Sequence, residues 1–127
     1  MTAPLLVTGA AGFIGMHVAE RLLDEGRPVV GVDCFNAYYD PALKEARAAR
    51  LEGRSGFEMV RADIADCDAM VELVRSRGVT QIVHLAAQAG VRYSLENPFA
   101  YERSNLAGHL SILEAARHNP VEHLVYA

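Results

Sequence analysis

Three glycines and one aspartate have the residue types and spacing that suit a dinucleotide. Gly9, Gly12 and Gly15 form G-x-x-G-x-x-G directly after the apolar run 5–7, and Asp33 ends a second apolar run 18 residues beyond Gly15. In a strand-to-helix turn such glycines allow a tight bend, close approach to a pyrophosphate and close helix packing. The helix start favours an anion. A carboxylate at the second strand end accepts ribose hydroxyls and repels a 2′-phosphate, so the pattern predicts NAD rather than NADP.

The elements that must position these residues alternate between strand and helix. Right-handed crossovers then predict an α/β fold, a Rossmann-type doubly wound parallel sheet of about five strands in order 3-2-1-4-5. Helices are expected on both faces of this sheet. The hydrophobic periodicity and the turn residues predict strands at 3–8, 28–33, 56–61, 80–87 and 121–127, and helices at 13–25, 41–51, 67–76 and 98–119.

Length, charge and composition indicate what kind of protein this is. The 127 residues suit one domain, and the net charge of −4 argues against a nucleic-acid partner. No apolar run is long enough to cross a bilayer, and the amino terminus does not resemble a signal peptide. Cys34 and Cys67 form no disulfide framework or metal pair and suit a reducing cytoplasm, so a cytoplasmic location is expected.

Several polar residues receive structural interpretations. His84 lies inside a predicted strand without a second ligand at suitable spacing, so we expect a buried, hydrogen-bonded histidine and no metal site. Asp66 is expected to cap the helix that follows it. Most charges of the 41–51 helix segment are expected on a solvated face: Lys44, Glu45, Arg47, Arg50 and Glu52. The helix over 98–119 is expected to have an apolar side that includes Tyr101, Leu106, Leu110, Leu113 and Ala116.

The glycine motif, with Thr8 before it and Phe13-Ile14 inside it, resembles the extended short-chain dehydrogenase/reductases, the family of NAD-dependent epimerases and dehydratases. The run His84-Leu85-Ala86-Ala87 is also typical of that family. The resemblance implies that an aspartate and an aliphatic residue after the third strand contact adenine, and Asp63 and Ile64 match. It implies the following cofactor-binding residues: Gly9, Gly12, Phe13, Ile14, Gly15, Asp33, Asn36, Asp63, Ile64, Leu85, Ala86, Ala87, Gln88 and Asn105. From the residues alone, Asn36 is a polar turn residue, and an exposed helix position is the alternative for Asn105.

The loop 88–98 discriminates within the family. Its run from Ala89 to Pro98 resembles the matching loop of UDP-glucuronate 4-epimerases almost residue for residue. Arg92 lies just past the carboxyl end of the fourth strand, where it can pair with a carboxylate or phosphate. We predict that Arg92 contacts substrate, although it could instead brace its own loop. Ser94 could donate to a sugar hydroxyl or cap the turn.

The family's catalytic serine or threonine segment and its Tyr-x-x-x-Lys pair do not occur in this sequence. Residues 1–127 are therefore expected to be the NAD-binding Rossmann portion of a longer enzyme, truncated before the Tyr-x-x-x-Lys helix, without a catalytic residue or the substrate-binding part. The resemblance implies a homodimeric, NAD-dependent nucleotide-sugar 4-epimerase that interconverts UDP-glucuronate and UDP-galacturonate through a 4-keto sugar. The chain alone is expected to bind NAD weakly, to lack turnover and to self-associate through its uncovered fifth strand. A 4,6-dehydratase, a decarboxylase or a non-catalytic NAD-binding regulatory module are the alternatives.

Overall fold

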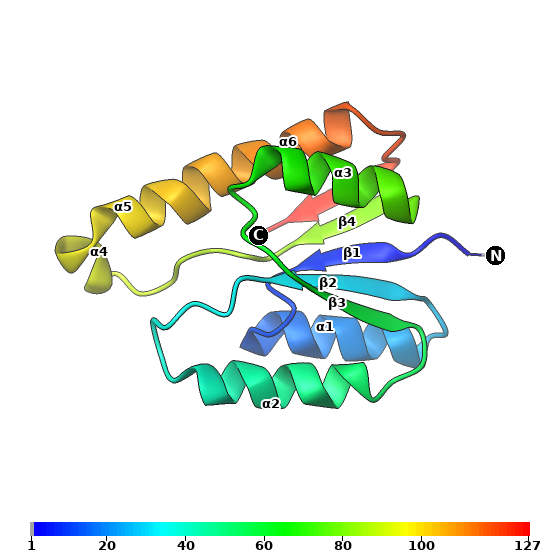
Figure 1. Cartoon of the computed structure of the whole chain (residues 1–127), viewed down its shortest axis with the longest axis horizontal. Coiled ribbons are helices and arrows are strands. Elements are labelled where there is room, and N and C mark those ends of the chain that lie inside the picture. Colours follow the sequence, from blue (N-terminus) through cyan, green and yellow to red (C-terminus); the bar gives the residue numbers. More distant parts are fainter. Residues whose placement is uncertain (1) are drawn as a thin grey trace.

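A single parallel sheet forms the centre of the structure, a computed structural model that describes residues 2–127. The strand order is β3-β2-β1-β4-β5, so the predicted order 3-2-1-4-5 is confirmed (Figure 1). β1 lies between β2 and β4, with Leu6 opposite Val30 on one side and Ile82 on the other. The strands are β1 (Leu5–Thr8), β2 (Val29–Asp33), β3 (Phe57–Arg61), β4 (Gln81–His84) and β5 (His123–Tyr126).

Helices cover both faces of the sheet, as the doubly wound fold requires. α1 (Phe13–Asp24) and α2 (Pro41–Glu52) pack on one face, and α3 (Cys67–Arg77) and α6 (Gly108–Arg117) pack on the other (Figure 1). The carboxylate of Asp66 accepts from the Ala69 N–H, which confirms its predicted role as the cap of α3.

Two apolar cores form because successive strand residues point to opposite faces. Leu6, Val30 and Ile82 face α3 and α6, whereas Val7 and Val29 face α1 and α2. All of these side chains are buried, and each contributes about 1.5–3 kcal/mol relative to exposure. The two cores fix the carboxyl ends of β1, β2 and β4 relative to one another.

The segment from 93 to 117 differs from the single helix predicted over 98–119. A short helix, α4 (Tyr93–Glu96), occurs within the predicted loop. After α5 (Pro98–Tyr101) the backbone widens into a π-helical segment, η1 (Glu102–Ala107), before α6 begins. A π-helical turn is strained and persists where tertiary contacts hold it. Here Gly108 packs so closely on Ile64 that a Cβ would lie 2.5 Å from that side chain.

The apolar side predicted for this helix is largely exposed. Leu106 and Leu110 are 66% and 60% exposed, whereas the face that meets α3 contains Ser111, Ile112 and Ala115. The buried residues of α6 also follow regular helical spacing, so periodicity alone does not show which of the two apolar stripes packs against the sheet. Among the helices of residues 2–127, none has the length and apolar composition of a membrane span.

Candidate functional site

In the glycine turn between β1 and α1, backbone segments approach one another so closely that a side chain at Gly9 or Gly15 would collide with them. Gly9 adopts φ +71°, and a Cβ there would lie 3.0 Å from the backbone nitrogen and Cα of Ala86. A Cβ at Gly15 would overlap the Gly9 carbonyl oxygen and lie 2.7 Å from its carbon. The first glycine therefore brings the end of β1 close to residues 85–87, which follow β4 and are called the β4 exit. The third glycine lets α1 start directly above the turn.

The amino terminus of α1 fits an anion. Gly12 is its N-cap, and within residues 2–127 no side chain caps the helix or adds a carboxylate to its first turn. The early N–H groups of the helix therefore keep their donor capacity, and Phe13, Ile14 and Gly15 line the adjoining cavity. Backbone donors and the helix dipole at this point fit a pyrophosphate.

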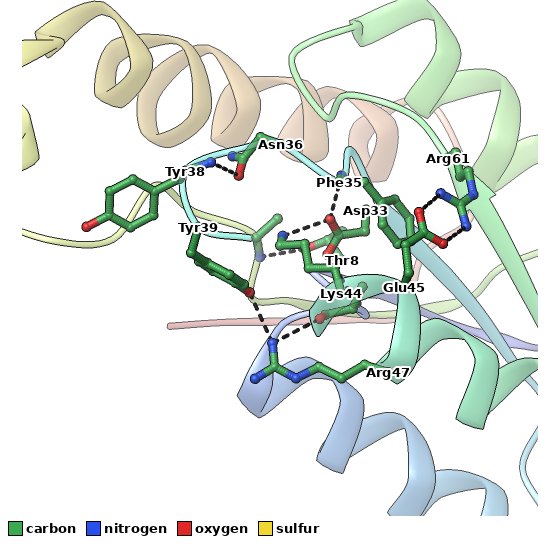
Figure 2. Close-up of polar contacts among 12 residues, drawn as sticks. Thr8, Asp33, Phe35, Asn36, Tyr38, Tyr39, Lys44, Glu45, Arg47 and Arg61 are labelled. Atoms are coloured by element: carbon green, nitrogen blue, oxygen red, sulfur yellow. Dashed lines mark hydrogen bonds and ion pairs between the residues drawn. The ribbon is translucent and has the colours of Figure 1, made fainter. Parts of the chain in front are cut away.

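Asp33 is buried at the end of β2, and its carboxylate has three partners (Figure 2). The Ala11 N–H donates to Oδ2 at 3.1 Å. The Phe35 N–H donates to Oδ1 at 2.9 Å, and the Lys44 ammonium lies 2.9 Å from the same oxygen. Phe35 reaches this position with φ +54°, while its ring packs 3.9 Å from the guanidinium carbon of Arg61. The carboxylate is held rigidly at the cavity wall.

Two cations of α2 point toward the glycine turn, and one of them, Lys44, lines the cavity. Lys44 is only 12% exposed and lies 5.7 Å from the centre of the Tyr39 ring. Arg47 donates to the Ala11 carbonyl oxygen at 3.3 Å and to the Tyr39 hydroxyl at 3.0 Å (Figure 2). The prediction that most of these charges lie on a solvated face is confirmed, because Glu45, Arg50 and Glu52 are exposed. Lys44 and Arg47 are the two exceptions, because this side of α2 packs over the glycine turn.

A cavity of about 370 Å³ opens at the carboxyl ends of β1, β2 and β4. This edge of a doubly wound sheet is where ligands bind. The wall contains all but one of the predicted cofactor-binding residues: Gly9, Gly12, Phe13, Ile14, Gly15, Asp33, Asn36, Asp63, Ile64, Leu85, Ala86, Ala87 and Gln88. The structure therefore brings these residues together around one space, although their ligand contacts stay predictions.

The wall also contains residues outside the predicted cofactor-binding set. They are Val32, Cys34, Tyr38, Tyr39, Lys44, Ala62, Ala89, Ser104 and Ala127. For Lys44 a signal was present, because Lys44, Ala48 and Leu51 follow the i, i+4, i+7 spacing of one helix face. Ala48 and Leu51 are fully buried, so this spacing places Lys44 on the inward side.

The residues predicted at the adenine end contact η1 and the start of α6. Asp63 Oδ1 accepts from the Ala65 N–H at 2.9 Å, and Oδ2 pairs with Arg103 Nε at 2.9 Å. Ile64 is buried against Gly108. The carboxylate and the aliphatic side chain thus have fixed positions at the cavity, next to η1.

The remaining predicted residues lie outside the cavity wall. Asn105 Oδ1 accepts from the Gln88 N–H at 2.8 Å, and its amide nitrogen donates to the Gln88 carbonyl oxygen at 3.2 Å. Asn105 therefore fixes the backbone of a wall residue. Arg92 is exposed at the start of α4, and the Ser94 hydroxyl donates to the Val91 carbonyl oxygen. The substrate contacts of Arg92 and Ser94 stay predictions.

Thr8 and His84 join β1 to the β4 exit. Thr8 Oγ1 accepts the N–H groups of Leu85 and Ala86 at 2.9 and 3.0 Å and lies 2.7 Å from His84 Nδ1. Because the two amides occupy its lone pairs, the hydroxyl hydrogen must go to Nδ1, and His84 is neutral with its proton on Nε2. The expectation of a buried, hydrogen-bonded histidine is confirmed. Because the N–H groups of Leu85 and Ala86 bond to the Thr8 hydroxyl, β4 ends at His84 and not at residue 87 as predicted.

His84 makes stability depend on pH. Burial and, secondarily, the charge of His109 lower the pKa of His84 from its ordinary 6.5 to about 4. Between these values the unfolded chain binds more protons, so stability falls as pH drops from about 6.5 to 4, by about 2 kcal/mol after solvent screening. Urea melts across this range should show this fall in wild type, and His84→Asn, which keeps an acceptor near Nδ1, should lack it. Equal slopes would contradict the assignment.

Among residues 2–127 no group of three or more histidine, cysteine, aspartate and glutamate side chains could hold a metal ion. Both cysteines are free thiols. Cys34 lines the cavity, and burial is the main cause that raises the pKa of its thiol. The polar groups of the cavity wall are therefore carboxylates, amides, hydroxyls, the Cys34 thiol and the Lys44 ammonium, together with backbone N–H groups.

Comparison with known proteins places this arrangement in a family. The family described as GDP-mannose 4,6 dehydratase matches residues 6–126. UDP-glucuronate 4-epimerase 4 of Arabidopsis thaliana is 50% identical over 124 residues, which cover 97% of this chain and 28% of that protein. A probable UDP-glucuronate 4-epimerase of Rhizobium meliloti is 51% identical over 122 residues, covering 96% of this chain and 36% of that protein. The chain spans about a third of the length of these curated relatives.

Solved structures agree with the sequence relatives. UDP-glucuronic acid 4-epimerase from Bacillus cereus, in complex with UDP-glucuronic acid and NAD, superposes with a TM-score of 0.86 at 35% identity, covering 97% of this chain and 39% of that one. UDP-glucose-4-epimerase from Stenotrophomonas maltophila with bound NAD gives a TM-score of 0.82 at 33% identity, covering 98% and 36%. This chain, with its glycine turn, its strand order and its match over residues 6–126, belongs to the GDP-mannose 4,6 dehydratase family of extended short-chain epimerases and dehydratases.

Proposed function

We propose that this chain is the NAD-binding portion of a nucleotide-sugar 4-epimerase that interconverts UDP-glucuronate and UDP-galacturonate. The observation that carries the proposal is the cavity at the carboxyl ends of β1, β2 and β4, lined by the glycine turn, Asp33, Asp63 and Ile64. Relatives about 50% identical to this chain include UDP-glucuronate 4-epimerases, and a similar solved structure holds UDP-glucuronic acid and NAD. These relatives support the uronic acid as the substrate.

The residues of the cavity fit the parts of NAD. The uncapped start of α1 offers backbone donors to the pyrophosphate, and Gly9 has no side chain where the chain passes close to the Ala86 backbone. Asp33 offers a fixed carboxylate to the adenosine ribose. Asp63 and Ile64 offer an acceptor and an apolar surface to adenine. When bound, NAD accepts hydride from the sugar and returns it.

The described residues bind and orient the cofactor, and no catalytic role is assigned to them. Arg92 and Ser94 keep their proposed contacts with the UDP-sugar. We also infer that the intact enzyme is a homodimer, as the resemblance implies, and that it is cytoplasmic, as the two cysteines without a disulfide framework suggest. The exposed Leu106 and Leu110 on one side of the helix are consistent with a protein contact.

The activity test uses UDP-glucuronate and NAD. An intact protein that carries this sequence is expected to form UDP-galacturonate, detected by separating the two nucleotide sugars. The 127-residue chain alone is expected to form none. Formation of a 4-keto-6-deoxy sugar or loss of CO₂ would favour the alternatives, a 4,6-dehydratase or a decarboxylase, and the description of the matching family keeps the dehydratase as the second candidate. NAD binding without any turnover by the intact protein would favour the regulatory module.

The role of Asp33 is tested by Asp33→Asn. Loss of one charged acceptor is expected to weaken NAD binding about tenfold and to reduce the preference for NAD over NADP, because a carboxylate disfavours the 2′-phosphate. Calorimetric titration with both dinucleotides measures the change. Asp24→Asn is the matched control, because Asp24 pairs with Arg54 on the surface and does not line the cavity. Unchanged NAD affinity in Asp33→Asn would contradict the assignment.

A further inference from the structure

Lys44 is placed to share the recognition of the adenosine ribose with Asp33. It is the single lysine of the sequence, which otherwise uses arginine for its side-chain cations. Its ammonium lies against Asp33 Oδ1 (Figure 2). Its side chain lines the cavity. Position, burial and charge therefore set Lys44 apart from the exposed ion pairs on the rest of α2.

The Asp33 carboxylate has too few free acceptor sites to bind both hydroxyls of a ribose. A carboxylate accepts about four hydrogen bonds, two at each oxygen. Oδ1 already accepts from the Phe35 N–H and from Lys44, and Oδ2 accepts from the Ala11 N–H. One site on Oδ2 is left, which can take one ribose hydroxyl. The second hydroxyl needs another partner at the same place on the wall.

Lys44 has free donors at this place on the wall. An ammonium has three N–H donors, and one of them is directed to Asp33. The Tyr39 ring lies beside the ammonium, and Arg47 donates to the Tyr39 hydroxyl, so the position of Lys44 is fixed before any ligand arrives. A lysine held in this way can donate to a hydroxyl oxygen or, more strongly, to a phosphate oxygen.

We propose that Lys44 and Asp33 act together as a mixed-charge ribose clamp, in which Lys44 is a specificity-determining residue that reduces the discrimination against NADP. The proposal rests on the proposed NAD-binding function. Asp33 accepts from one ribose hydroxyl and Lys44 donates to the other. With NADP, the Lys44 ammonium faces the 2′-phosphate and offsets part of the repulsion from Asp33. The preference of this chain for NAD is therefore smaller than a lone carboxylate would produce.

The first test compares Lys44→Met with wild type by calorimetric titration. Methionine keeps the stem length and removes the charge, so NADP affinity is expected to fall about tenfold and NAD affinity about threefold or less. The NAD preference therefore rises, the direction opposite to that expected for Asp33→Asn. Lys44→Arg keeps the charge and should retain most NADP binding. Arg54→Met is the matched control, because Arg54 pairs with Asp24 outside the cavity.

A second test observes the Lys44 side chain directly by NMR. With ¹³C-labelled lysine, the chain gives one lysine side-chain signal set by NMR, since no other lysine is present. Both dinucleotides should shift the Cε signal, NADP more than NAD, whereas nicotinamide mononucleotide, which lacks the adenosine ribose, should not. A purely structural Lys44–Asp33 pair would lower stability in Lys44→Met without changing the affinity ratio or responding to the 2′-phosphate.

The outcomes separate this inference from the proposed function. If wild type binds NAD, but Lys44→Met leaves the NADP-to-NAD affinity ratio unchanged and the Cε signal does not move, the ribose clamp is wrong and the proposed function stands. If folded wild type binds neither dinucleotide by calorimetry and the Cε signal is unmoved, both are wrong.

Discussion

Gly15→Ala is expected to abolish NAD binding and to lower the free energy of unfolding by about 3 kcal/mol. The added Cβ would overlap the Gly9 carbonyl oxygen and lie 3.1 Å from the Ala10 Cα. These neighbours are backbone atoms, so relief requires movement of the whole turn between β1 and α1. That turn also supplies the donors proposed for the pyrophosphate. Urea denaturation and calorimetric titration measure the two effects.

Gly53→Ala is the matched control for this substitution. Gly53 follows α2 with φ −73°, and a Cβ there would meet carbonyl oxygens only at the ordinary distance of 3.7 Å. Its free energy of unfolding is expected to stay within about 0.5 kcal/mol of wild type, and NAD binding should be unchanged. If Gly15→Ala behaved like Gly53→Ala, the tight strand–helix turn would not exist as described.

Thr8→Val is expected to lower the free energy of unfolding by about 3 kcal/mol without creating a cavity. The hydroxyl satisfies the N–H groups of Leu85 and Ala86 and donates to His84 Nδ1. Valine has nearly the same shape, so the substitution leaves three polar groups without their partner beneath the β4 exit. Urea melts at neutral pH measure the loss.

Two further variants isolate the hydroxyl of Thr8. Thr8→Ser keeps it and removes one methyl group, so a loss of only about 1 kcal/mol is expected. Thr80→Val makes the same chemical change at a half-buried position where no side-chain hydrogen bond is present within residues 2–127, and its effect should be below about 0.5 kcal/mol. Equal effects of Thr8→Val and Thr80→Val would contradict the network.

The fold could be predicted because the relevant signals are local. Apolar runs such as 5–7 and 29–32 identify buried parallel strands, and right-handed crossovers then leave few possible strand orders. The positions of Gly9, Gly15 and Asp33 at the cavity follow from the same signals. A strand end, a turn and a helix start are fixed by neighbouring residues, so their geometry is accessible from spacing alone.

The parts that were missed depend on contacts between distant segments. The direction of Lys44 is decided by the packing of α2 over the glycine turn, and charges on both sides of the helix obscured its inward stripe. The π-helical segment depends on the contact between Gly108 and Ile64 and on the bonds from Asn105 to Gln88. Periodicity also does not show which of two apolar stripes on α6 is covered. Leu106 and Leu110 of the predicted apolar side are exposed, whereas Ala116 packs against the core.

Calorimetric titration of the 127-residue chain with NAD and, in parallel, with NADP tests the central claim most directly. We predict weak binding of NAD, with a measurable preference over NADP. A circular dichroism melt of the same sample establishes that the chain is folded. A cooperatively melting chain that binds neither dinucleotide, or that prefers NADP, would contradict the assignment of the glycine turn and Asp33 to an NAD site.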